Sequence, residues 1–154
     1  MLLDAIDDLR RIVPPILDAL IWERPGGAAS IGFHMLHLAG SADRLLTYAT
    51  GAPLSESQRK WLAAEKDPES LGMSGADLLE RAVGTLERAL GVLRHTSAEE
   101  LDLPRPVGRA ALPSSVRGLL YHVAEHSQRH LGQIATTVKV VQGSDESPLG
   151  ESGE

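Results

Sequence analysis

The chain has 154 residues, a formal net charge of −6, 42% hydrophobic and 23% charged residues, and no cysteine. This is the size and composition of one ordinary globular domain, long enough to bury a core without cross-links. The lack of cysteine excludes disulfides, thiolate metal sites and a cysteine nucleophile, so a transition metal would need imidazole, carboxylate or water ligands. The negative charge and an aromatic content of 3% argue against nucleic acid as a partner, because phosphate binding needs a basic face and single strands need stacking platforms.

We expect neither a membrane span nor a secretory signal in this sequence. No apolar run approaches the roughly 20 residues that a membrane-crossing helix requires. Asp4 follows the first residues directly, where a signal peptide would place a basic region. We therefore expect a cytoplasmic protein that does not associate with membranes.

Apolar residues recur at three- and four-residue spacing through most of the chain, as on one face of a helix. Four long helices are predicted in chain order, over residues 2–21, 31–49, 75–94 and 116–141. The first contains Pro14 and Pro15, and because proline removes an amide donor, we expect a kink or break there. Serines precede the other three long helices, where their hydroxyls can cap the first turn. These helices predict an all-α fold, a four-helix bundle.

The connections are less regular. A short amphipathic helix is expected over residues 55–66, and the Ser97-x-x-Glu100 spacing of a capping box predicts a helical turn after it. The two connections flanking the third helix are long, so neighbouring helices need not all alternate in direction. Residues 143–154 are glycine, serine and acid with little to bury, which predicts a flexible acidic tail after a bundle spanning residues 1–142.

Five of the six histidines fall on two predicted helices: His34 and His37 on the second, and His122, His126 and His130 on the fourth. A spacing of four turns a helix by roughly 400°, so the last three share one face. An adjacent pair can hold one ion, but the outer two are roughly 12 Å apart along the axis and cannot. Spacing alone leaves open which adjacent pair binds, and which histidine of the second helix completes the set. With water, three such nitrogens form a catalytic metal site with an open position.

The histidines also allow other interpretations. A histidine on a helix face is usually a surface or hydrogen-bonded residue, and His95, near a helix C-terminus, is expected to be one. A zinc protease needs glutamate directly after the first histidine of the pair, where Val123 and Ser127 stand. Di-iron bundles need Glu-x-x-His, but Gln128 stands three residues after Glu125.

Two segments resemble motifs of a known family. Residues 30–39, Ser-Ile-Gly-Phe-His-Met-Leu-His-Leu-Ala, and residues 126–134, His-Ser-Gln-Arg-His-Leu-Gly-Gln-Ile, resemble the second- and fourth-helix motifs of the DinB/YfiT-like metalloenzymes. The resemblance covers about residues 1–141 and implies a four-helix bundle of up-down-down-up topology. It also implies one divalent metal ion, held by one histidine of the second helix and a pair just before Gly-Gln. In this chain those positions are His37, His126 and His130, which gives His34 and His122 supporting or core roles.

Some positions depart from the family pattern or are ambiguous. The family often has arginine where this chain has Leu131, so a role of that arginine in binding substrate or a subunit would be missing. Gly132 is interpreted as a close helix contact, and Gln133 either as a support of the site or as polar surface. No general base is evident, and Glu125 is a weak candidate because one residue of offset turns it about 100° from His126.

Family members with known activity include thiol transferases and isomerases that use bacillithiol, mycothiol or glutathione. The resemblance therefore implies a metal-dependent enzyme with thiol-dependent transferase or hydrolase chemistry on a small electrophilic molecule. We expect zinc or nickel, a small-molecule substrate, a low-molecular-weight thiol and a homodimer. A non-catalytic metal-binding or stress-response module is the alternative, and a helical interaction protein with vestigial histidines is a third.

Overall fold

The computed structural model describes residues 1–13 and 18–144, and these residues form helices and loops without a named strand. The four long helices are α1 (Leu2–Ile12), α3 (Ile31–Ala49), α5 (Gly75–His95) and α7 (Val116–Ser144). The short helices are α2 (Asp18–Ile21), η1 (Pro25–Gly27), α4 (Glu56–Ala64), η2 (Pro68–Leu71) and α6 (Ala98–Leu101). The predicted all-α class is confirmed.

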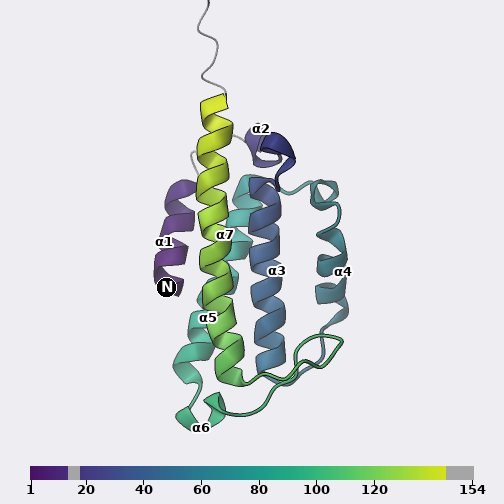
Figure 1. Cartoon of the computed structure of the whole chain (residues 1–154), viewed down its shortest axis with the longest axis vertical. Helices are drawn as coiled ribbons and strands as arrows, with labels where there is room; N and C mark the ends of the chain where they lie inside the picture. The colour runs from purple at the N-terminus through teal and green to yellow at the C-terminus, as the bar shows by residue number, and fades with distance from the viewer. Residues whose placement is uncertain (14–17, 145–154) are drawn as a thin grey trace, which may run out of the picture.

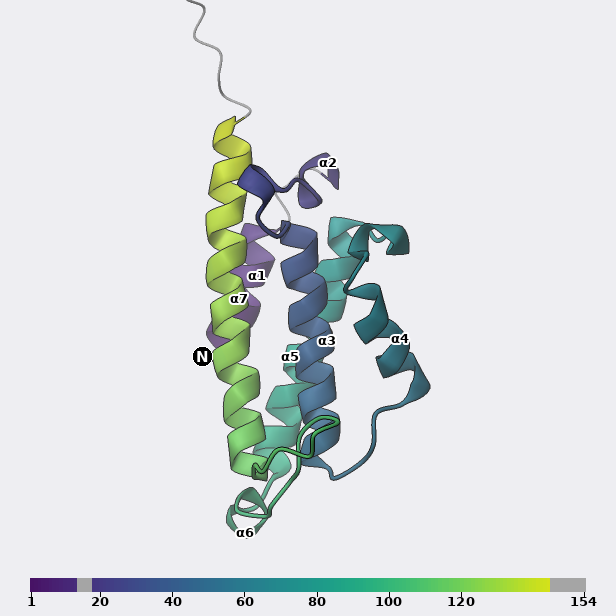
Figure 2. The same cartoon turned by 45° about the vertical axis from the view of Figure 1, so that its right-hand side comes forward.

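The four long helices pack as a bundle of up-down-down-up topology. In Figure 1, α1 runs upward, α3 and α5 both run downward, and α7 returns upward. Helix α3 packs against α5 and α7, and α1 packs against the same two helices. The turned view in Figure 2 shows α4 outside the bundle, alongside α3. The long connections on either side of α5 make this order feasible, as the sequence indicated.

Two predicted boundaries differ from the structure. The predicted first helix is divided, since α1 ends at Ile12 and α2 begins at Asp18. The kink expected at Pro14 and Pro15 lies outside the described residues. At the other end, α7 continues to Ser144, so Gly143, the expected first residue of the tail, belongs to the last helical turn. The rest of the predicted tail, residues 145–154, also lies outside the described residues.

Serine caps account for most helix starts. The Oγ atoms of Ser30, Ser55, Ser74 and Ser97 each accept a hydrogen bond from the backbone N–H three residues later. Ser115 accepts in the same way from the amide of Gly118, at 3.1 Å, near the start of α7. These hydroxyls satisfy amide donors that a helix leaves unpaired in its first turn, which is why the helices begin where the sequence predicted.

Two glycines of α3 allow tryptophan rings to lie directly against its backbone. A Cβ atom on Gly32 would lie 2.4 Å from Cζ3 of Trp22, and one on Gly40 would lie 2.5 Å from Cδ1 and Nε1 of Trp61. Trp61 Nε1 also donates a hydrogen bond to the carbonyl oxygen of Leu36, at 3.2 Å. Gly40 and Trp61 together fix α4 against the bundle.

The bundle interior is mainly apolar in the described residues, and its buried histidines, His34 and His130, lie between α3 and α7. Leucine, isoleucine, valine and methionine side chains from all four long helices form its core. None of the helices in the described part of the chain combines the length and apolar character needed to cross a membrane.

Candidate metal centre

Four histidines meet where α3 and α7 pack against each other. His34 and His37 lie one turn into α3, and His126 and His130 lie at the facing level of α7. One ring nitrogen from each of His37, His126 and His130 lies within 4.8 Å of the other two. The structure therefore brings together the three residues that the resemblance selected.

The spacing of the three rings suits a single small ion. Nε2 of His37 and Nε2 of His126 are 3.1 Å apart, and the ring of His130 lies 4.8 Å and 4.5 Å, centroid to centroid, from those of His37 and His126. Zinc binds imidazole nitrogen at about 2.0–2.1 Å, which places two tetrahedral ligand atoms about 3.3 Å apart. Little movement is needed to coordinate one ion.

Glu65, the residue that caps the C-terminus of α4, orients His37. Its Oε2 atom lies 2.7 Å from Nδ1 of His37, and its Oε1 atom accepts a hydrogen bond from Arg44 at 2.7 Å. Burial raises the pKa of Glu65, but hydrogen bonds from His37 and Arg44 and the charge of Arg44 outweigh burial and lower it below its ordinary value. An ionised carboxylate can only accept, so His37 donates from Nδ1 and keeps the Nε2 lone pair for a metal.

His34 plays the corresponding role for His130. The Nδ1 atoms of these two buried rings are 3.1 Å apart, so one donates a hydrogen bond to the other. This contact uses Nδ1 of His130 and leaves its Nε2 atom for the space shared with His37 and His126. The supporting role expected for His34 is therefore consistent with its position, whereas His122 is exposed.

Three histidines of the cluster, His34, His126 and His130, are neutral near pH 7. Burial, reinforced by the charges of neighbouring histidines, lowers the pKa of His130 to about 3 and that of His126 to about 4. Burial and the charge of His37 also lower the pKa of His34. Neutral imidazole is the form that binds metal, so these rings are prepared to act as ligands without first losing a proton.

One buried nitrogen of the cluster has no hydrogen-bond partner within the described part of the protein. Nδ1 of His126 is buried and has no hydrogen-bond partner, and it is the one such side-chain atom in residues 1–13 and 18–144. Burying an unpaired polar atom costs about 1–3 kcal/mol. Three converging imidazole nitrogens fit a divalent transition ion.

Comparison with known proteins agrees with this geometry, because residues 2–134 match the DinB superfamily. The chain belongs to the DinB superfamily. No curated protein matches the sequence.

Two supporting residues of this DinB-superfamily chain were not found by sequence reasoning. Glu65 and Arg44 are separated by 21 positions and lie on different elements, so no periodic spacing connects them with His37. The one available signal was a run of charges at the end of a predicted short helix. Such a run normally indicates a solvated surface.

Two sequence interpretations need correction. The space around Gly132 is open, with nothing within 4 Å of a Cβ added there, so it is not a close helix contact. The 100° offset understated the reach of Glu125, whose carboxylate lies within 4.8 Å of ring nitrogens of His122 and His126.

Leu131 and Gln133 have clearer roles in the structure. Leu131 is buried in the core of this DinB-superfamily chain, so the position at which the family often has arginine serves packing here. Gln133 is exposed, and it lines a surface cavity together with His34. His95 is the exposed last residue of α5 and contacts the Gly91 carbonyl at 2.7 Å, as expected of a capping residue.

Proposed function

We propose that this DinB-superfamily chain binds one divalent metal ion, zinc or nickel, on His37, His126 and His130. We propose further that it uses the ion in thiol-dependent transferase or hydrolase chemistry on a small electrophilic molecule. The observation that carries the proposal is the convergence of three imidazole nitrogens, one each from His37, His126 and His130, within 4.8 Å. No fourth histidine, aspartate or glutamate joins this group in the described part of the chain. Three protein ligands and an open position are typical of catalytic rather than structural zinc.

In this proposal the metal ion supplies the chemistry, and the residues around His37 hold that ligand in place. The ion would supply a Lewis acid that lowers the pKa of a thiol or water, so that a nucleophile is available near neutral pH. Glu65 holds the proton of His37 on Nδ1, and Arg44 keeps Glu65 ionised. The ring of Phe33 stacks on that of His37, with centroids 5.6 Å apart and planes at 11°, and limits its rotation.

A small cleft beside His37 supports a small-molecule substrate. Its volume is about 270 Å³, and Phe33 and Glu65, which both contact His37, line it. Arg24 and Lys66 also line this cleft and offer cations to the carboxylates of a thiol such as glutathione. Asp67 and Glu69 line it as well, so an amino group could be accommodated at the same time.

A non-catalytic metal-binding module is the second candidate, because no free general base is evident. Glu65 is engaged by both His37 and Arg44, and Glu125 forms an ion pair with Arg129. A chain that binds metal but turns nothing over would fit this second candidate. The expected homodimer is part of either proposal and is checked by sedimentation of the purified protein.

The deciding experiment is elemental analysis of untagged protein, followed by activity assays. About one zinc or nickel ion per chain is expected, together with transfer of bacillithiol, mycothiol or glutathione to an electrophile such as a chlorinated nitrobenzene. His95→Ala serves as the control, because His95 lies on α5 and outside the cluster. A metal content near zero after reconstitution would refute the proposed site, whereas bound metal without activity towards any thiol would favour the second candidate.

A further inference from the structure

Trp61 forms a rigid platform on the side of α4 that faces α5. Its ring lies against Gly40, where any larger residue would collide with it, and its Nε1 atom is held by the Leu36 carbonyl. The edge of the indole is thus used by α3, and one face remains for a neighbour. Arg81 of α5 occupies that face, with its Cζ atom 3.6 Å from the ring centroid.

Arg81 has hydrogen-bond donors that the protein does not use. In the part of the chain that the structure describes, Arg81 donates no hydrogen bond and forms no ion pair. A guanidinium carries five N–H donors in its own plane. Contact with the Trp61 ring restrains this planar fork, which is the geometry that binds a carboxylate through two parallel hydrogen bonds.

The carboxylate whose charge acts on Arg81, that of Asp43, is hydrogen-bonded to other side chains. Both carboxylate oxygens of Asp43 are already bonded, Oδ1 to Arg88 at 2.9 Å and Oδ2 to Gln58 at 2.8 Å. Arg88 also donates to Oγ1 of the buried Thr85, at 3.2 Å. Arg81 and Arg88, seven residues apart, lie on the same face of α5, and Arg88 takes the ion pair with Asp43.

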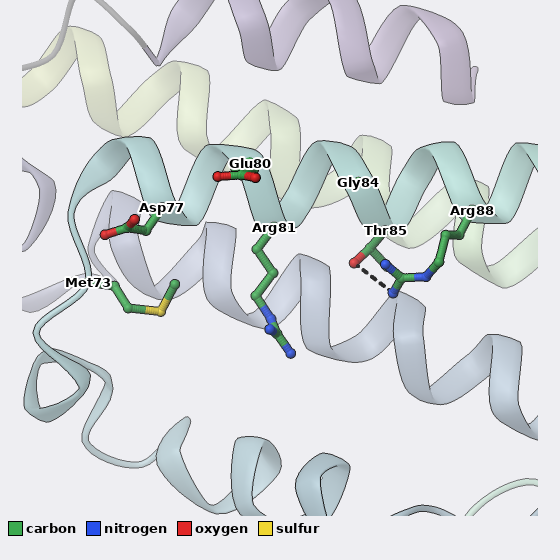
Figure 3. Close-up of a pocket in the computed structure, with 7 residues that line it drawn as sticks. All are labelled: Met73, Asp77, Glu80, Arg81, Gly84, Thr85 and Arg88. Carbon is green, nitrogen blue, oxygen red and sulfur yellow. Dashed lines mark hydrogen bonds between the residues drawn. The ribbon is translucent and has the colours of Figure 1, made fainter.

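Arg81, Thr85 and Arg88 line a cavity of about 540 Å³ along α5, and no histidine of the metal centre lines it. Figure 3 shows Arg81 extending away from α5, and Glu80, which precedes it on the helix, also lines the cavity. Met73 and Asp77 lie at the far end, where hydrogen bonds from Ser74 lower the pKa of Asp77 and keep it ionised. A negative group at that end disfavours a second anionic group on the ligand, and the Met73 side chain offers apolar contact.

We propose that this cavity binds a small organic monoanion, with its carboxylate on the guanidinium of Arg81 and its uncharged body towards Met73. The site is separate from the proposed metal centre and does not depend on it. Trp61 and Gly40 position Arg81, and Arg88 contributes by holding Asp43 away from it. The cavity volume suits a ligand of one ring or a short chain.

The test uses benzoate as the probe and benzamide as its neutral isostere. Full-length protein labelled with ¹⁵N is titrated while the indole N–H resonance of Trp61 is followed, with Trp22→Phe to assign the two tryptophan signals. Benzoate is expected to shift the Trp61 resonance saturably, and Arg81→Gln should raise its Kd at least about tenfold, as expected for loss of charged hydrogen bonds. Benzamide should bind at least about tenfold more weakly than benzoate, for the same reason.

Matched variants separate this site from general charge and from the metal. Arg94→Gln removes the same charge from an exposed position of α5 that does not line the cavity, and it should leave the Kd unchanged. His126→Ala should also leave it unchanged, which excludes coordination of benzoate to a metal ion. Equal binding to wild type and Arg81→Gln would overturn the proposal, and so would an equal effect of Arg94→Gln. Tighter binding of inorganic phosphate than of benzoate would overturn the assignment to a monoanion.

Discussion

Glu65→Gln tests whether a residue outside the four-helix bundle controls the metal centre. The substitution keeps the size of the side chain and an acceptor oxygen but removes the negative charge from between His37 and Arg44, both 2.7 Å away. A neutral amide holds the His37 Nδ1 proton less strongly, so Nε2 becomes a weaker ligand. We expect metal affinity to fall without loss of any ligand.

The expected size follows from the structure. Removing a group that orients a metal-binding histidine typically costs 10- to 100-fold in affinity, or about 1.4–2.7 kcal/mol. The metal-free protein should also lose about 1–3 kcal/mol of unfolding free energy, because the Arg44 side chain is only 11% exposed and would lose its ionic partner. The two effects are separable, since one is measured by metal titration and the other by urea unfolding in chelator.

Affinity is measured by competition with a chromogenic zinc chelator at fixed pH and salt. Glu69→Gln is the matched control, because Glu69 is exposed, lines the same cleft and changes the net charge equally. Glu65→Asp keeps the charge but shortens the side chain by one methylene, so it should also weaken binding if contact with His37 is what matters. Equal zinc affinity in wild type, Glu65→Gln and Glu69→Gln would refute the role assigned to Glu65.

Three further predictions concern the ligands, the pH and the packing. His126→Ala or His130→Ala should abolish tight zinc binding, whereas His122→Ala should keep most of it; the opposite order, measured as metal per chain, would place the site one turn away. In metal-free protein the pKa of His130 is about 3, but an unfolded histidine titrates near ~6.5. Between these pH values the unfolded chain therefore binds more protons than the folded chain. The unfolding free energy should fall as the pH drops below about 6.5, by up to about 1.4 kcal/mol per pH unit. In urea titrations, His130→Gln should remove the contribution of His130 to this pH dependence. Gly40→Ala should cost about 1–3 kcal/mol, because the new Cβ would lie 2.5 Å from the tryptophan of α4, whereas Gly91→Ala, with open space around it, should be neutral or stabilising in thermal melts.

Much of the fold follows from local signals. The spacing of apolar residues and the capping serines placed α3, α5 and α7 to within three residues at each end, because both signals act over single helical turns. The end of α7 was harder to predict, since one glycine in the last turn costs about 1 kcal/mol and is tolerated near a frayed terminus.

The candidate site could be predicted only in part, because helix periodicity relates residues of one helix and not residues of different helices. His126 and His130 share a helix face by arithmetic, but the choice of His37 over His34 rested on family resemblance. In the structure the two α3 histidines differ in their neighbours: His37 contacts Glu65, and His34 contacts His130. These contacts join segments that are far apart in sequence, so no periodic pattern could reveal them.

The contacts of the short helix α4 are the part of the structure that the sequence did not predict, and both proposed sites depend on them. Its sequence has no buried residue and reads as a weakly amphipathic connector. In the structure, Trp61 packs on Gly40 and holds Arg81, and one turn later Glu65 holds His37. A glycine in mid-helix weakens α3 by about 1 kcal/mol relative to alanine, yet here it lets α4 approach closely enough for both contacts. The substitution of one glycine should therefore disturb the positions of Glu65 and Arg81 together, which links the proposed metal centre and the proposed anion site through the packing of a single short helix.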